Sequence, residues 1–220
     1  MTYYEHVRRE IQPLLPKSAS QILDVGAGAG TTLNWLKSIY PNAETTGVEI
    51  NSALHAELKK NADVAIIGDV DGCFSQLQNY DLILLLDVLE HLVDSLSTLR
   101  KLSTRLKVGG SVIVSVPNIA HFSVSIPLLL QRRFSYSDAG ILDRTHLRFF
   151  VEQTAIELLN SANFRVTKGI ISGLRGPRSN LLDRLSFGLL RHHLAKQYIM
   201  RGELGHGEIV QKTIHWMATR

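Results

Sequence analysis

The 220-residue chain contains one cysteine, Cys73, so no disulfide can form within it. A chain with so little cysteine is typical of a reducing compartment, and we expect a cytoplasmic protein. Long apolar runs are also missing, since a stretch such as residues 82–86 is far shorter than the roughly 20 residues that cross a bilayer. The first ten residues contain no apolar region of the kind that directs secretion.

Aromatic residues are few, at 7%, and the net charge is only +4. This mild positive charge does not by itself indicate a nucleic-acid partner, and we expect no DNA binding. Apolar residues make up 45% of the chain and charged residues 20%. These proportions predict one α/β domain over residues 1–220 with a sizeable core.

Three glycines at alternate positions follow a short apolar stretch in the sequence I-L-D-V-G-A-G-A-G, residues 22–30. This pattern predicts a strand, a tight turn and the start of a helix, with a turn that a ligand can approach closely. About 20 residues later, Glu49 ends a second predicted strand, where an acid can accept hydrogen bonds from ribose hydroxyls. The dinucleotide fingerprint needs its third glycine at position 31, where this chain has Thr31, so the spacing disfavours NAD.

Strand and helix patterns alternate up to residue 116 and again after residue 150, which predicts a doubly wound parallel sheet. Asn51 is expected to cap a helix, and Lys107–Gly110 is expected to form a turn. Strands are expected at residues 21–25, 44–49, 64–67, 82–86, 111–116, 165–171 and 208–218. Helices are expected at residues 3–12, 52–60 and 151–162, and a further helix is expected after the glycines, with Leu33, Leu36 and Ile39 near one face and an end before Pro41.

The sequence D-V-G-A-G-A-G, residues 24–30, resembles the first motif of class I S-adenosylmethionine (SAM)-dependent methyltransferases. Residues 68–69, 81–92, 106–110 and 115–118 resemble further motifs of that family. The resemblance implies a mostly parallel seven-stranded Rossmann-like sheet with a helical cap, formed by insertions at about residues 119–148 and 173–206. It also implies SAM as cofactor, held by Asp24, Gly26, Ala27, Gly28, Gly30, Glu49, Ile50, Gly68, Asp69, Asp87 and Val88.

Three strings resemble a narrower bacterial group that accompanies surface-polysaccharide assembly, and also the ubiquinone-type O-methyltransferases. They are D-V-L-E-H-L at residues 87–92, V-P-N-I-A-H at 116–121 and G-I-L-D-R-T-H-L-R-F-F at 140–150. The implied reaction is methyl transfer to an oxygen of a small molecule or of a glycan or lipid-linked sugar precursor. The alternatives are an N-methyltransferase, an RNA-end methyltransferase and a non-catalytic SAM-binding domain.

An alcohol acceptor must lose a proton, and histidine titrates near neutrality, which suits a general base. His146 and His121 both lie in the segment that covers the acceptor in this family. His146 is the first candidate, with Asp143 expected to orient its ring, and His121 is the second. A structural hydrogen-bonding role is the alternative for His146, and His91 is expected to cap or pack a helix.

The string D-x-x-E-H, formed by Asp87, Glu90 and His91, raises a metal site as a further alternative, with His146 as a later ligand. Carboxylates with imidazole suit Mg²⁺ or another divalent ion. The resemblance does not require a metal, because the same string is common in methyltransferases that use none, and we do not expect one.

Basic and apolar residues alternate between positions 175 and 201. This pattern predicts either a solvated helix packed by its leucines or a peripheral contact with an anionic lipid or phosphate-bearing acceptor. The basic members are Arg175, Arg178, Arg184, Arg191, His192, His193, Lys196 and Arg201. Together with residues 122–133, this segment is the candidate for a mobile cap.

Overall fold

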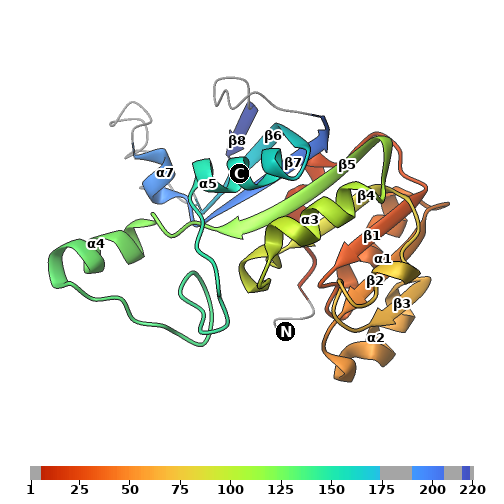
Figure 1. Ribbon diagram of the computed structural model, residues 1–220, viewed down its shortest axis with the longest axis horizontal. Helices are drawn as coiled ribbons and strands as arrows, with labels where there is room; N and C mark the ends of the chain where they lie inside the picture. The colour runs from red at the N-terminus through yellow and green to blue at the C-terminus, as the bar shows by residue number, and fades with distance from the viewer. Residues whose placement is uncertain (1–5, 174–189, 206–214, 219–220) are drawn as a thin grey trace.

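One eight-stranded sheet forms the middle layer of the computed structural model, which describes residues 6–173, 190–205 and 215–218 (Figure 1). The strand order is β3-β2-β1-β4-β5-β7-β6-β8. Strands β1 to β5 pair in parallel, β7 runs antiparallel to both β5 and β6, and β8 is parallel to β6. The predicted doubly wound, mostly parallel sheet is therefore confirmed, with one strand more than the seven expected.

The strands are β1 Gln21–Val25, β2 Glu44–Glu49, β3 Val64–Ile67, β4 Tyr80–Leu86, β5 Leu106–Pro117, β6 Phe164–Ser172, β7 Gln197–Leu204 and β8 His215–Ala218. The α-helices are α1 Thr31–Ile39, α2 His55–Asn61, α3 Ser95–Ser103, α4 Phe122–Gln131, α5 Glu152–Ser161 and α7 Arg191–Leu194. Short 3₁₀ helices occur at η2 Arg9–Leu14, η3 Ser52–Leu54, η4 Phe74–Gln76 and η5 Leu89–His91. Asn51 caps η3 as predicted, because its side chain accepts a hydrogen bond from the Ala53 N–H.

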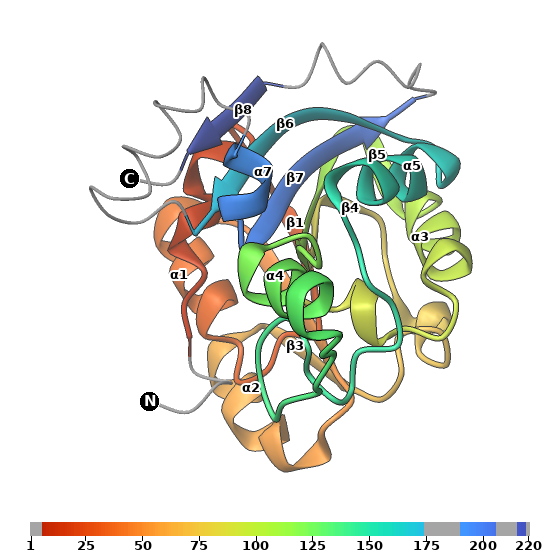
Figure 2. The same cartoon turned by 90° about the vertical axis from the view of Figure 1, so that its left-hand side faces the viewer.

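Two apolar layers cover the two faces of the sheet, and β4 contributes to both. Leu82 and Leu84 pack with α1, α2 and η2, whereas Ile83 and Leu85 pack with α3 and α5. Figure 2 shows α1 on one side of the sheet and α3 and α5 on the other. A strand that is buried on both faces has apolar residues at consecutive positions, and this explains the apolar sequence Leu82–Leu86.

Two local predictions near the chain's first half need correction. The helix expected at residues 3–12 is instead the 3₁₀ helix η2, which contains Pro13, and residues 1–5 lie outside the described part. The turn expected at Lys107–Gly110 lies inside β5, at a place where the pairing with β4 shifts register. The four residues lie between the Tyr80–Leu106 and Leu82–Ser111 pairs and have no paired residue on β4, and Gly109 has a φ of +80°, so the turn is present as an irregularity within the strand.

The tail also differs from the prediction, because Gln197–Leu204 is not part of a basic helix but forms β7. This strand lies between β5 and β6 and supplies the antiparallel strand that was expected at residues 208–218. Residues 215–218 form the additional strand β8, while residues 206–214 lie outside the described part. The second cap insertion, predicted at 173–206, therefore contains α7 and β7 in its described portion, and residues 174–189 are outside it.

The segment after β5 extends away from the sheet. In Figure 1, α4 lies at the end of a projection, and the chain returns from it along a long loop to α5. His121 begins this helix by accepting a hydrogen bond from the Ser123 N–H. Within the described ranges, no helix combines the length and hydropathy that crossing a membrane requires.

Candidate functional site

The glycine turn and the acid at the end of β2 are joined by hydrogen bonds. The Glu49 carboxylate accepts from the Gly28 N–H at 2.8 Å through one oxygen and from the Asn51 N–H at 2.9 Å through the other. Gly26 has a φ of +72°, and a Cβ there would lie 2.6 Å from the Val88 side chain. The turn is thus shaped for glycine by both conformation and space, and Glu49 holds the loops after β1 and β2 together.

Asp24 lies beneath this turn, at 3% exposure, at the place where the first motif has its acid. Burial raises the pKa of Asp24 to about 7, the nearby Arg8 guanidinium opposes that shift, and the charge of Glu49 adds to it. A buried carboxyl group with so high a pKa is typical of a functional site. A cationic ligand next to it would favour its charged form.

The other predicted cofactor residues also follow the ends of parallel strands. Ile50, after β2, is exposed, and so is Asp69, after β3. Gly68 has a φ of +150°, and a Cβ there would lie 2.7 Å from the Cys73 sulfur. These positions form one edge of the sheet, where ligands bind in open α/β folds.

Arg8 belongs to the site, although sequence reasoning did not identify it. Its guanidinium contacts the carboxylate of Asp87 at 2.6 Å, the Ser115 hydroxyl at 3.2 Å and the Gln197 side-chain oxygen at 3.2 Å. The Ser115 hydroxyl and the Gln197 amide also donate to Asp87. The segment before β1 is thereby tied to the ends of β4 and β5 and to the start of β7.

Asp87 itself has a backbone φ of +59°, which is uncommon for a residue other than glycine. Such strain persists only where surrounding contacts enforce it, and it gathers at functional sites. Here the backbone N–H of Asp87 donates to the Ser115 hydroxyl at 2.9 Å, and the side chain is held by Arg8. The turn after β4 is therefore fixed in one conformation.

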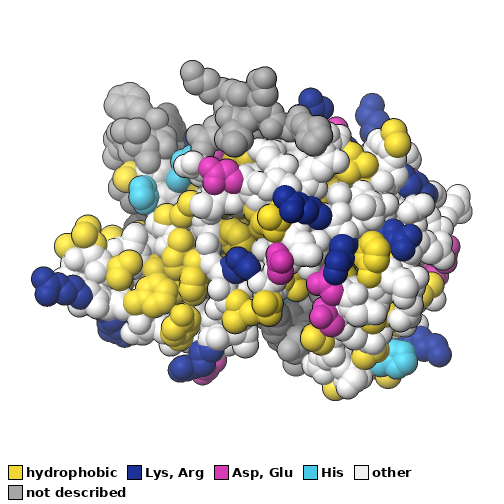
Figure 3. Space-filling view, viewed as in Figure 1, with side chains coloured by type: hydrophobic (Ala, Val, Ile, Leu, Met, Phe, Trp, Pro, Cys, Tyr) yellow, Lys and Arg dark blue, Asp and Glu magenta, His cyan; other side chains and the backbone are white. Residues whose placement is uncertain are grey.

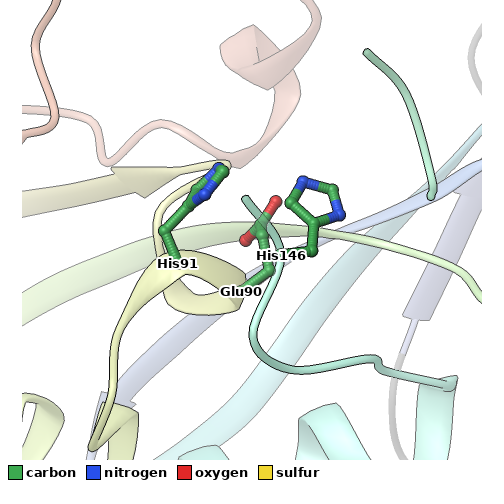
Figure 4. Close-up of side chains that lie close together, drawn as sticks. All are labelled: Glu90, His91 and His146. Atoms are coloured by element: carbon green, nitrogen blue, oxygen red, sulfur yellow. The ribbon is translucent and has the colours of Figure 1, made fainter. Parts of the chain in front are cut away.

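Glu90, His91 and His146 converge just beyond this turn, and we call them the Glu90–His91–His146 cluster (Figure 4). One donor atom from each side chain lies within 4.8 Å of the others. The N–H groups of Leu147 and Arg148 donate to the Glu90 carbonyl at 2.8 and 3.1 Å, which holds the His146 loop against η5. Asp87 is not a member, because its carboxylate is engaged by Arg8.

The orientation of His146 differs from the prediction. Its Nδ1 lies 3.1 Å from the Ile141 carbonyl oxygen, whereas the Asp143 carboxylate accepts from the N–H and hydroxyl of Thr145. The prediction that Asp143 orients this ring is therefore wrong. Because a carbonyl only accepts, Nδ1 carries the hydrogen and Nε2 is left with a free lone pair. Burial, together with neighbouring His91, lowers the pKa of His146, so its ring is neutral at pH 7.

Burial also shifts the pKa values of Glu90 and His121. Burial, followed by the charge of Asp87, raises the pKa of Glu90 well above its ordinary value. Burial, with a smaller contribution from Lys196, lowers the pKa of His121 to about 4. Because His121 accepts the Ser123 N–H through Nδ1, its role in this structure is to cap α4.

The described part of the basic segment makes contacts within the fold. His192 lies 2.9 Å from the Glu152 carboxylate and 3.1 Å from the Tyr198 hydroxyl, and Arg201 lies 3.1 Å from Glu203. Arg175, Arg178 and Arg184 lie outside the described residues. His192 and Arg201 therefore have partners within the fold.

A family model for a methyltransferase domain matches residues 2–168. The chain belongs to this methyltransferase family. A search of curated proteins gives no match. This methyltransferase resembles a SAM-dependent methyltransferase from Archaeoglobus fulgidus, at 17% identity and a TM-score of 0.65, over 89% of this chain and 90% of that one.

Two further solved structures have the same fold. The magnesium protoporphyrin IX methyltransferase of Synechocystis PCC 6803 with bound S-adenosylhomocysteine (SAH) is 14% identical, with a TM-score of 0.58 over 88% of this chain and 78% of that one. The mitomycin 7-O-methyltransferase MmcR is 17% identical, with a TM-score of 0.56 over 85% of this chain and 49% of that one. This family uses SAM as its cofactor. The glycine turn fits that cofactor, and the Val88 side chain leaves room only for a glycine at position 26.

Proposed function

We propose that this SAM-dependent methyltransferase methylates a hydroxyl oxygen, on a small molecule or on a glycan or lipid-linked sugar precursor. When bound, SAM supplies a methyl group already activated by its sulfonium. The protein must then position the acceptor and remove one proton. The observation that carries the proposal is the free Nε2 lone pair of His146, in a neutral ring at the sheet edge where SAM is expected.

The remaining residues have supporting roles in this proposal. The glycine turn and Glu49 bind the cofactor, while Arg8 and Asp87 fix the turn that carries Glu90. His146 accepts the proton of the acceptor hydroxyl, and His121 supports the segment that covers the acceptor. An O-methyltransferase among the solved structures of the same fold supports an oxygen acceptor.

Turnover assays with a panel of sugar and phenolic hydroxyl acceptors test the proposal, with mass spectrometry to locate the transferred methyl group. His146→Gln keeps a hydrogen-bonding side chain that cannot take a proton, and it should lower kcat by a factor of about 10² to 10⁴. His55→Gln, at an exposed position on α2, is the matched control and should keep full activity. Near-wild-type kcat in His146→Gln, or methylation of nitrogen only, would contradict the proposal.

An exposed apolar surface on α4 favours an acceptor presented by a membrane. Leu129 is 80% and Leu130 is 74% exposed, and Arg132 and Arg133 follow them after Gln131. Figure 3 shows hydrophobic side chains gathered over this projection. Apolar residues next to basic ones suit the boundary of an anionic bilayer. We propose that the cytoplasmic enzyme makes peripheral contact with lipid through α4.

Co-sedimentation with vesicles rich in anionic phospholipid tests this contact. Leu129→Glu should reduce the bound fraction several-fold, because it puts a charge into the apolar face. Val108→Glu changes a fully exposed residue at the other end of β5 and should bind like the wild type. Equal binding by both variants would contradict a role for α4.

A further inference from the structure

The Glu90 carboxylate has no hydrogen-bond partner for one of its oxygens, although the residue is only 1% exposed. A buried polar atom without a partner costs free energy, so native proteins rarely keep one without a function. Figure 4 shows this carboxylate between the rings of His91 and His146, which come from two different segments of the chain. One oxygen of this carboxylate lies within 4.8 Å of a ring nitrogen of each histidine.

Both rings are held in the tautomer that a metal ligand needs. The Nδ1 of His91 lies 3.2 Å from the Thr145 carbonyl oxygen, and the Nδ1 of His146 lies 3.1 Å from the Ile141 carbonyl oxygen. Each Nδ1 must carry the hydrogen, which leaves each Nε2 as a donor of its lone pair. Histidines that ligate metals almost always donate their other N–H to a carbonyl or carboxylate in this way.

We propose that the Glu90–His91–His146 cluster binds a divalent transition metal, with Zn²⁺ as its preferred occupant. The inference rests on the proposed function, because it describes how the same site would bind the acceptor hydroxyl and help it to lose its proton. Two imidazoles and one carboxylate suit Zn²⁺ better than Mg²⁺, which prefers oxygen ligands. The D-x-x-E-H string alone indicated an oxygen-rich set, but Arg8 holds Asp87 away from the cluster.

The dimensions of the cluster are close to those of such a site. Zinc binds nitrogen and oxygen at about 2.0–2.2 Å, which places tetrahedral ligand atoms about 3.3 Å apart. The three donor atoms here lie within 4.8 Å of one another. Side-chain rotations that move each donor atom by about 1 Å would bring them to the spacing of a zinc site. His91 is the last residue of the 3₁₀ helix η5 and His146 lies in a loop, and the Glu90 carbonyl joins the two segments by accepting from the Leu147 and Arg148 N–H groups.

Three protein ligands leave a fourth coordination position for the acceptor. A hydroxyl bound there loses its proton more easily, as metal-bound water does, and the proton passes to solvent. The acceptor oxygen then forms its bond to the methyl carbon as the carbon–sulfur bond breaks, which gives a methyl ether and SAH. In this scheme the Nε2 of His146 would bind the metal, so His146 would hold the metal in place instead of acting as the base, while the reaction would remain methyl transfer to a hydroxyl oxygen.

Calorimetric titration of Zn²⁺ into the chelator-stripped full chain tests the inference directly. We expect one site per chain, and visible absorption bands of tetrahedral Co²⁺ when that ion replaces Zn²⁺. Glu90→Gln should weaken Zn²⁺ binding by about 100-fold or more, because losing even an outer partner costs 10- to 100-fold. His91→Gln gives a second test that removes a different ligand. His55→Gln is the exposed histidine control and should bind like the wild type.

The outcomes separate the metal from the proposed function. Wild-type protein that binds no Zn²⁺, or that binds it no better than Glu90→Gln and His91→Gln do, overturns the metal site. SAM binding and turnover of the stripped chain, measured in parallel with chelator present, report on the methyltransferase itself. Full turnover without metal would leave His146 as the base and would also overturn the inference.

Discussion

Replacing Asp24 with asparagine should stabilise the protein increasingly as the pH rises. Asp24 is 3% exposed, and burial raises its pKa from 3.8 to about 7. The folded state therefore holds this proton more tightly than the unfolded chain does. The stabilisation from that proton is complete below the unfolded pKa and is lost as the pH rises through about 7.

The size of the effect follows from the shift in pKa. A shift of about 3 pKa units corresponds to about 4 kcal/mol between the two protonation states. Between pH 5 and pH 8, the contribution of Asp24 to the free energy of unfolding falls by about 3 kcal/mol. The asparagine in Asp24→Asn does not titrate, so the free energy of unfolding of the variant does not decrease with pH on account of this position. For a chain of this size, the Tm difference between variant and wild type should grow by about 5–10 °C over that range.

Thermal and denaturant unfolding at several pH values, without cofactor, measure this difference. Asp138→Asn is the matched control, because it makes the same chemical change at an exposed side chain. Its Tm should follow the wild-type pH profile. If the Asp24→Asn and wild-type profiles run parallel from pH 5 to pH 8, burial does not raise the pKa of Asp24 and the reasoning fails.

Three other substitutions test the site. Glu49→Ala should weaken SAM binding by about 1.5–3 kcal/mol in calorimetry, because it removes the acid that is predicted to bind the ribose and that ties Gly28 to Asn51; tight NAD binding with no SAM binding would contradict the assignment. Arg8→Ala should lower the free energy of unfolding by about 3 kcal/mol in denaturant titrations, because it leaves the Asp87 carboxylate without its cation. Gly26→Ala should abolish SAM binding, since its Cβ would lie 2.6 Å from Val88, and unchanged affinity would refute that geometry.

The alternating part of the fold could be predicted because each segment carries its own local signal. The strand before the glycines and the helix after them are found where the sequence indicates them, at Gln21–Val25 and Thr31–Ile39. Strand β7 could not be found this way. Gln197–Leu204 resembles a continuation of the basic segment, and it becomes a strand because β5 and β6 both offer it antiparallel partners.

In the site, too, the residues marked by a local sequence pattern could be predicted, whereas contacts between distant parts of the chain could not. The glycine turn and Glu49 were predicted from spacing, since the turn follows β1, Glu49 ends β2, and these two strands pair in the sheet. Arg8 was missed because its partner Asp87 lies 79 positions further along the chain. Asp143 was placed wrongly for the opposite reason. It is close to His146 in sequence, but the turn directs its carboxylate to Thr145.

Four carboxyl groups at this edge of the sheet lie in three different environments, and the difference indicates where positive charge is needed. Glu49 is satisfied by two backbone N–H groups, and Asp87 is paired with Arg8. Asp24 and Glu90 are both buried, and burial raises the pKa of each. Because burying a carboxylate without a cation is costly, such groups persist where a positive charge arrives with a ligand. The sulfonium cofactor, if it binds at the predicted glycine turn, would supply one such charge near Asp24, and the proposed metal would supply the other at Glu90.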